Sequence, residues 1–314
     1  MNTKNNSVIT YRASIILLFV TSLAIHITCY GNELRLSPNS PGRNSLGTQH
    51  TISTNQNSNI IYHNYYERGN GPTVILLPSL GRPASDFNEL TTFLSSSGFK
   101  TIAIDLNQST NNNSKIELNL FQMADQVDEL IGSLSLKKNE RVFVVGHAFG
   151  NRLARAYATK YTKKVNSVVL LAAGGKVDIA PDIKLSMKQS FDPKTSYLNH
   201  YKAVKHAFFS NKNTIPTYWL IGWNPTLAMA QVYATLNTDY STWWSAGGVP
   251  ILVIQGNEDA IAPSKHTSEL LKSEYGDKVQ VILVSPAGHA LLPEKPDLIN
   301  KAVSEFINKQ LEIN

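Results

Sequence analysis

The 314-residue sequence has a single cysteine, Cys29, so neither a disulfide-stabilised fold nor a site with several cysteine ligands is possible. It also has no run of five or six like charges, although the formal net charge is +6. No basic stripe interleaved with aromatic residues is present, and we therefore expect no binding of nucleic acid. Stability must come from burial of apolar residues, which make up 42% of the chain.

Several ligand-binding motifs are missing as well. The sequence contains neither a phosphate-binding loop nor a glycine-rich dinucleotide fingerprint. It has no closely spaced group of histidine and acidic residues of the kind that binds a metal ion. We therefore expect no cofactor and no metal, and the sequence does not indicate an oligomeric state.

Residues 1–31 have the parts of a secretory signal peptide. Lys4 and Arg12 precede an apolar run at residues 15–25, and cleavage after Gly31 would place Cys29 and Gly31 at the two positions that require small residues. The run is shorter than the roughly 20 apolar residues of a membrane span. We therefore expect export to the periplasm or the medium, with cleavage after Gly31 and no stable membrane span afterwards. The alternative is an uncleaved segment that anchors the protein to the membrane.

Beyond this segment the pattern predicts one linker and one folded domain. Residues 32–58 are rich in Asn, Ser, Thr, Pro and Gly without apolar periodicity, which is typical of a flexible linker. In residues 59–314, short apolar runs alternate with segments of helical periodicity. Strands are predicted at 73–78, 99–105, 141–146, 165–173, 249–256 and 278–284, with an antiparallel edge pair at 59–69. Helices are predicted at 85–98, 119–134, from 149 onward, 264–276 and 296–311.

This alternation of strand and helix predicts an α/β fold with a mostly parallel central sheet and helices on both faces. Only residues 174–246 interrupt it, and they are too many for a loop. They contain all four tryptophans and predict a helical cap insertion over the carboxyl edge of the sheet. Most of its aromatic rings should form the core of the cap, and a few should line a cavity for a small, largely apolar molecule.

The stretch GHAFG, from Gly146 to Gly150, joins a predicted strand to a predicted helix. Its two glycines permit the tight strand–turn–helix geometry of a nucleophile elbow, G-x-S-x-G. The central residue is Ala148, however, which has no oxygen, no sulfur and no acid–base chemistry. His147 is expected to be a structural residue turned away from the substrate. The pattern thus predicts a nucleophile position from which the nucleophile is missing.

Two later motifs follow predicted strands: GNEDAIAP at residues 256–263 and SPAGHALLPEKP at residues 285–296. With the elbow and the order of elements, they resemble the α/β-hydrolase fold over about residues 59–311. The resemblance is to the lid-bearing branch related to bacterial esterases and haloalkane dehalogenases. It implies an acid and a base in these two motifs, in the order that is usual for this fold.

The resemblance implies a role for individual residues. Asp259 would be the acid, with Glu258 as the alternative, and it would hold the tautomer of the base His289. The backbone N–H groups of Leu80 and Phe149 would form the oxyanion hole.

The loop that contains Leu80 departs from the family pattern. Where the family often has His-Gly, this sequence has Pro78 and Ser79. Ser79 carries a hydroxyl group near the expected site, but it would be a nucleophile only with a base beside it. Arg82 could reach the mouth of the pocket, but an exposed surface position is the favoured expectation. Backbone donors do not depend on these side chains.

Two functions remain open without the serine. The first is an enzyme, most simply of hydrolase type, that acts on a small apolar substrate. In it His289, oriented by Asp259, deprotonates water or a substrate group, which supports hydrolysis without an acyl-enzyme or a lyase-type reaction. The second is a catalytically inactive, exported protein that binds a small molecule. Loss of the attacking serine costs roughly 10⁶ in turnover, whereas the remaining groups are worth roughly 10³–10⁴ over water. The retained acid and base favour the enzyme, because a pure binding protein needs neither.

Overall fold

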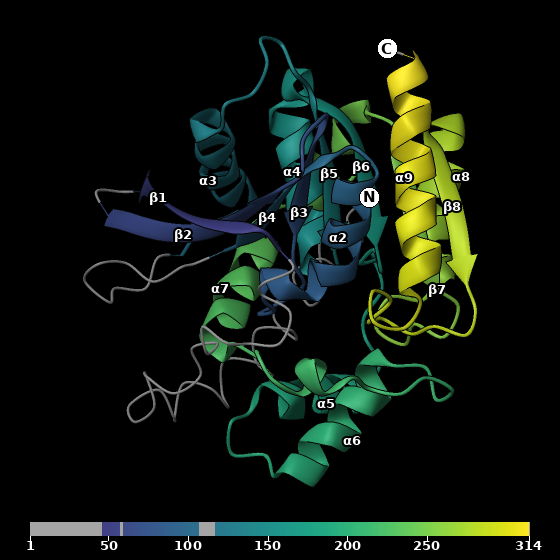
Figure 1. The fold of residues 1–314 in the computed structure, drawn as a ribbon. Helices are drawn as coiled ribbons and strands as arrows, with labels where there is room; N and C mark the ends of the chain where they lie inside the picture. Colours follow the sequence, from purple (N-terminus) through teal and green to yellow (C-terminus); the bar gives the residue numbers. More distant parts are fainter. Residues whose placement is uncertain (1–45, 57–58, 107–116, 314) are drawn as a thin grey trace, which may run out of the picture.

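A computed structural model describes residues 46–56, 59–106 and 117–313, so the predicted signal peptide lies outside the described residues. The fold is an eight-stranded sheet in the order β1-β2-β4-β3-β5-β6-β7-β8 (Figure 1). β1 and β2 pair antiparallel, as do β2 and β4, and the remaining pairs are parallel. The predicted α/β fold with a mostly parallel sheet is thereby confirmed. The strands are β1 (Thr48–Gln56), β2 (Asn59–Arg68), β3 (Thr73–Leu77), β4 (Lys100–Asp105), β5 (Val142–His147), β6 (Val165–Leu171), β7 (Ile251–Gly256) and β8 (Val279–Val284).

The central strands β3, β5, β6 and β7 are buried at every residue, which explains their continuous apolar runs. Helices cover both faces of the sheet (Figure 1). α2 and α9 pack together on one face, and α3 and α4 pack together on the other, where α8 also contributes to the core. The helices outside the cap are α2 (Asn88–Ser96), α3 (Leu120–Ser133), α4 (Phe149–Lys160), α8 (Ser268–Tyr275) and α9 (Pro296–Ile313).

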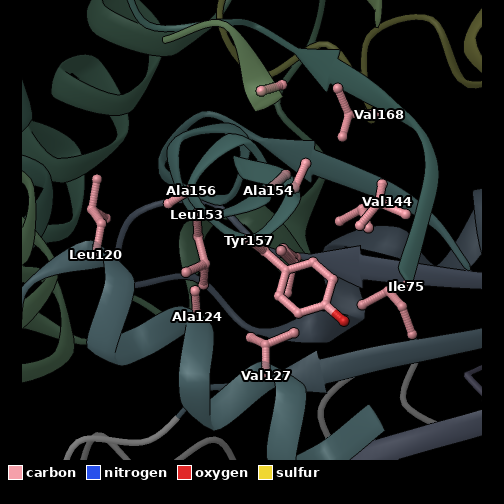
Figure 2. Packing of buried hydrophobic residues seen from close by; sticks show 14 of the residues in the cluster. Ile75, Leu120, Ala124, Val127, Val144, Leu153, Ala154, Ala156, Tyr157 and Val168 are labelled. Carbon is pink, nitrogen blue, oxygen red and sulfur yellow. The ribbon is translucent and has the colours of Figure 1, made fainter. Parts of the chain in front are cut away.

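Figure 2 shows the core between α3, α4 and the sheet. Tyr157 of α4 lies between Val127 of α3 and Ile75 of β3, Leu153 of α4 lies beside Ala124 of α3, and all five side chains are buried. The first turn of α3 is fixed by a capping box, in which the Asn119 side chain and the side chain of the third helical residue exchange hydrogen bonds with backbone N–H groups. This packing fixes α4, and with it the turn at its amino end.

The edge of the sheet corrects two expectations. Residues 48–56 of the expected linker form β1, and residues 59–69 contain the single strand β2 rather than a pair. β1 is an edge strand whose side chains are mostly exposed, so polar Thr, Ser and Asn suffice and no apolar alternation marks it.

The segment between β6 and β7 contains α5 (Pro181–Phe191), α6 (Tyr197–Phe208) and α7 (Pro225–Leu236). Figure 1 shows α5 and α6 beyond the ends of the strands. Trp219 and Trp223, with ring centres 5.7 Å apart, anchor a separate apolar cluster in this cap. Within the part of the chain that the structure describes, no helix has the length and apolar character needed to cross a membrane.

Candidate active site

Four loops meet at one edge of the sheet, because they follow the carboxyl ends of the parallel strands β3, β5, β7 and β8. In this order, the four loops are the predicted oxyanion loop, the elbow, the acid loop and the histidine loop. Ser79, Leu80, Ala148, Phe149 and His289 from these loops line one common cavity.

The turn between β5 and α4 has the geometry of a strained elbow. Ala148 adopts φ 50° and ψ −106°, and its N–H donates to the Leu171 carbonyl at 2.9 Å. A non-glycine residue in this conformation costs about 1–3 kcal/mol, so the packing around it must hold it there. A Cβ on Gly146 would lie 2.3 Å from the Gly150 carbonyl oxygen, and one on Gly150 would lie 2.0 Å from that of Leu77. Both glycines are therefore required by close backbone approach.

His289 and Asp259 form a buried pair. Nδ1 of His289 donates to the two carboxylate oxygens of Asp259 at 2.8 and 3.0 Å. The carboxylate also accepts the N–H groups of Ile261 and Ala262 at 3.0 and 2.8 Å and the Gln255 amide at 2.7 Å. These donors fix the position of the carboxylate, and the N–H at Nδ1 leaves Nε2 of His289 with the free lone pair of the ring. No residue within the described ranges forms a hydrogen bond with that nitrogen.

Glu258, the alternative acid, points to a different partner. Its carboxylate accepts a hydrogen bond of 2.6 Å from the hydroxyl of Ser210, a residue that lies just after the end of α6. Ser210 N–H in turn donates to Glu294 at 2.8 Å, and the other oxygen of Glu294 accepts the N–H groups of Gly288 and Leu291. The loop of His289 and the acid loop are thus both tied to the cap. Glu294 was not predicted from the sequence; its position in the motif SPAGHALLPEKP is the only sequence signal for it.

His147 is fully buried and donates through Nε2 to the carbonyl oxygen of His289 at 2.9 Å. Burial, followed by the nearby charge of His289, lowers the pKa of His147 to about 3. It is therefore neutral at physiological pH. It does not line the cavity, and its contact supports the loop that carries His289.

Leu80 and Phe149, whose N–H groups are the expected oxyanion donors, both line the cavity. Neither N–H donates a hydrogen bond to another described residue, so both remain available to a ligand. The loop around Leu80 is held by α7, because Gly81 N–H donates to the Gln231 side chain at 2.7 Å. Gly81 also accepts the Asn224 N–H at 2.9 Å. The contribution of Gln231 could not be read from the sequence, because 150 residues separate it from Gly81.

The expectation for Arg82 is wrong: its exposed fraction is only 2%. Its guanidinium forms a bidentate pair with Asp86 at 2.7 and 2.9 Å and lies 4.4 Å from the ring centre of Trp219. The cap covers it, and local sequence gives no sign of that. Ser79 lines the cavity, but no base among the described residues forms a hydrogen bond with its hydroxyl. Nothing in this geometry activates Ser79 as a nucleophile.

The cavity has a volume of about 610 Å³, large enough for a small organic molecule. It lies between the four loops and the cap, and His289 is in its wall. Apolar side chains supply most of the lining, including Leu80, Phe149, Ile179, Met187, Phe191, Phe208, Val232, Leu236, Trp243, Trp244 and Ile261. No group of three or more histidine, cysteine or acidic residues able to hold a metal ion occurs in the described ranges.

Comparison with curated proteins gives distant relatives. This chain is 36% identical over 75 positions to Protein ECM18 of Saccharomyces cerevisiae. The matched stretch covers 24% of this chain and 16% of the yeast protein. They are 22% identical over 210 positions to "Putative esterase/lipase 2" of Mycoplasma genitalium, covering 64% of this chain and 74% of that one. The chain thus spans only a small part of the length of the first relative.

Among solved structures, a thermophilic esterase from Thermogutta terrifontis superimposes with a TM-score of 0.65. The match covers 84% of this chain and 99% of the esterase at 18% identity, which establishes a common fold. The family model described as serine aminopeptidase, S33, matches residues 70–296, a span that includes the elbow, the acid loop and His289. The chain therefore belongs to the serine aminopeptidase S33 family of proteins with the α/β-hydrolase fold.

Proposed function

We propose that this protein is a hydrolase that uses water, rather than a side chain, as its nucleophile. The observation that carries this proposal is the buried pair of His289 and Asp259, with Nε2 of the histidine directed away from the acid. The same cavity wall contains Ala148, Leu80 and Phe149. A base, an oriented acid and two free N–H groups are the parts of an acyl-transfer site without its serine.

In the proposed reaction, Nε2 of His289 takes a proton from a water molecule as the water oxygen bonds to the ester carbonyl carbon. The carbonyl oxygen becomes an oxyanion and accepts the N–H groups of Leu80 and Phe149. Collapse of this intermediate breaks the bond to the alcohol oxygen, which leaves with the proton that His289 has taken up. Asp259 stabilises the imidazolium throughout and stays ionised. No acyl-enzyme forms, because Ala148 has no atom that can carry an acyl group.

The substrate class that we propose is a small and largely apolar ester. The cavity volume of about 610 Å³ and its apolar lining support this size and polarity. The signal-like segment at residues 1–31 supports action outside the cytoplasm.

A second function has one observation in its favour, the alanine at position 148. A site that has lost its nucleophile loses roughly 10⁶ in turnover, or about 8 kcal/mol of barrier, relative to a serine enzyme. The cavity would then serve to bind a small molecule without converting it. The retained His289–Asp259 pair makes this the weaker candidate, because binding alone does not require a base held by a carboxylate.

The deciding experiment measures hydrolysis of short-chain p-nitrophenyl esters by three proteins: the natural form, Ala148→Ser and His289→Ala. Water activation predicts slow turnover by the natural protein that is lost in His289→Ala. Restoring serine should raise turnover and produce a burst of nitrophenol from an acyl-enzyme. If the natural form and His289→Ala are equally inactive, while an apolar ligand still raises the melting temperature, the binding protein is the better account. An acyl-enzyme trapped on the natural protein would contradict both.

A further inference from the structure

The first turns of α6 expose apolar side chains at the outer end of the cap. Tyr197 and Leu198 are 71% and 59% exposed, and Tyr201 is exposed as well. Side chains three and four positions apart in a helix are neighbours, so these three form one surface, which we call the α6 patch. Ser210, just after α6, contacts the acid loop, so the helix ends beside the sheet and begins away from it (Figure 1).

Only the second half of α6 buries its apolar side chains. There Val204, Ala207 and Phe208 belong to the apolar cluster of the cap. A neighbouring segment adds Ile221, which is 47% exposed and follows the short helix η4 (Thr217–Leu220) that contacts α6. Exposed apolar side chains gathered at one place indicate a surface that meets something less polar than water.

The sequence around the α6 patch carries positive charge and no carboxylate. From Pro193 to Thr238 the chain has four lysines and neither aspartate nor glutamate. Lys194 precedes α6 and Lys202 directly follows Tyr201; both are exposed, and neither forms an ion pair with any residue that the structure describes.

Two carboxylates of the cap lie beside α6. Asp192 is partly buried and accepts the backbone N–H of Lys194 at 2.9 Å. Asp182 of α5 lies 3.6 Å from Nε2 of His206, which is more than one turn beyond Tyr201. They offset positive charge at the two ends of α6, so a surface that meets the patch faces tyrosine, leucine and lysine.

This combination fits a lipid surface. Tyrosine has an apolar ring with a polar hydroxyl and is favoured where hydrocarbon meets water. Lysine places its apolar stem along the same boundary and is attracted by anionic headgroups. A protein partner would engage about 20 to 30 residues on each side, many more than the patch offers.

The cavity also reaches the surface of the cap. Leu185 of α5, which packs beside α6, lines the cavity and is nevertheless 55% exposed. A molecule apolar enough for the cavity also partitions into a bilayer, so contact with a bilayer would bring its source close to the protein.

We propose that the α6 patch docks on a lipid bilayer that contains anionic lipids. Tyr197, Leu198 and Tyr201 enter the interface, and Lys194 and Lys202 contact the headgroups. Docking requires no turnover, so this proposal stands or falls independently of the proposed function.

The test places a tryptophan in the patch. The indole added by Leu198→Trp is exposed, whereas the four natural tryptophans are at most 4% exposed. The full chain is mixed with vesicles of phosphatidylcholine and phosphatidylglycerol in a ratio of about 3 to 1, whose acyl chains carry bromine as a quencher. We expect the emission of the added indole to lose intensity and to shift to shorter wavelength.

Leu311→Trp is the matched control. Leu311 is 40% exposed near the carboxyl end of α9, at the opposite end of the molecule from α6 (Figure 1). Its emission should not change. This control is needed because the apolar segment at residues 15–25 can itself enter a bilayer, so vesicle binding by the full chain does not show which surface is docked.

A second pair of variants tests the charge. Lys202→Gln should weaken binding to the anionic vesicles about fivefold. Lys301→Gln on α9, where the side chain is 74% exposed, should change it by less than about twofold. Vesicle sedimentation measures both.

Absence of quenching in Leu198→Trp overturns the proposal, as does equal quenching in Leu198→Trp and Leu311→Trp. A short-wavelength emission of Leu198→Trp before vesicles are added would show that a second copy or another part of the chain covers the patch, which also overturns it. Equal binding to vesicles with and without phosphatidylglycerol contradicts the role of the lysines. Should Leu198→Trp fail to fold, Tyr197→Trp takes its place.

Discussion

The carboxylate of Glu294 accepts the backbone N–H of Gly288, the residue before His289, at 2.8 Å. The same oxygen accepts the N–H of Leu291, and the other oxygen accepts the N–H of Ser210 and the side-chain amide of Asn213. A buried carboxylate with four donors thus holds the loop of the proposed base without touching its imidazole. It acts as a positioning residue.

Glu294→Gln should therefore destabilise the protein and disturb this loop. An amide nitrogen cannot accept a hydrogen bond, so two of the four bonds to the charged group are lost, and we expect a loss of about 3 kcal/mol in the free energy of unfolding. Urea denaturation measures it. Glu305→Gln on α9 is the matched control, because that side chain is 65% exposed in its pair with Lys301. A similar loss in both variants would contradict the role given to Glu294.

The assignment of the acid can be tested in the Ala148→Ser background. Asp259→Asn removes the carboxylate that fixes the tautomer of His289, and turnover should fall by about 10⁴-fold. Glu258→Gln alters the neighbouring carboxylate, which binds Ser210 instead, and turnover should fall by less than about tenfold. Steady-state kinetics with a p-nitrophenyl ester measures both. A larger loss of turnover in Glu258→Gln than in Asp259→Asn would identify Glu258 as the acid.

The elbow glycines are predicted to be structurally indispensable. An alanine at position 150 places its Cβ 2.0 Å from the carbonyl oxygen of Leu77, and the strand and helix must move apart. Gly150→Ala should cost about 3 kcal/mol or more of stability. Gly132→Ala on α3 has no neighbour within 4 Å and should stabilise the helix by about 0.5–1 kcal/mol. Relative to the natural protein, the melting temperature should be lower for Gly150→Ala and higher for Gly132→Ala.

Stability should depend on pH through His63, a buried residue of β2 bonded to Thr54. Burial lowers the pKa of His63 to about 4, from about 6.5 in the unfolded chain. Above pH 6.5 both states are neutral here and the residue contributes no pH dependence. Between pH 6.5 and 4 only the unfolded chain takes up the proton. The free energy of unfolding therefore decreases by about 1.4 kcal/mol for each unit by which the pH is lowered. Below pH 4 the loss levels off.

His63→Gln should remove this part of the slope. His147, with its pKa lowered to about 3, makes the same kind of contribution in both proteins, so the difference between them reports His63 alone. Urea denaturation at pH 7, 6 and 5 provides the measurement. Identical slopes for the two proteins would show that His63 does not titrate as described.

Much of the fold could be predicted because its strands are buried on both faces and therefore have continuous apolar runs. The predicted limits of β3 to β8 differ from the observed ones by one or two residues. β1 was missed for the opposite reason: an exposed edge strand needs no apolar face, so its Thr, Ser and Asn residues look like linker.

The candidate site could be predicted only where it is encoded locally. Asp259, His289 and the elbow glycines stand in short motifs next to strands, and the fold brings them to one edge. Arg82 was misjudged because what buries it, Trp219 of the cap, lies 137 residues further along the chain. Positioning contacts between distant segments leave no pattern in either segment alone.

The polar contacts between the cap and the loops at the sheet edge are not spread evenly over the cap helices. After α6, Ser210 binds both the acid loop and Glu294, and Gln231 of α7 binds the loop after β3. Among the described residues, the hydrogen bonds and ion pairs of α5 stay within residues 178–206. Swinging α5 outward therefore breaks no polar contact with the sheet, whereas moving α6 or α7 would disturb the acid loop, the histidine loop or the loop after β3. The acid loop, the histidine loop and the loop after β3 are therefore held by the later part of the cap, from Ser210 onward, whereas the polar contacts of α5 hold it to its neighbours within the cap.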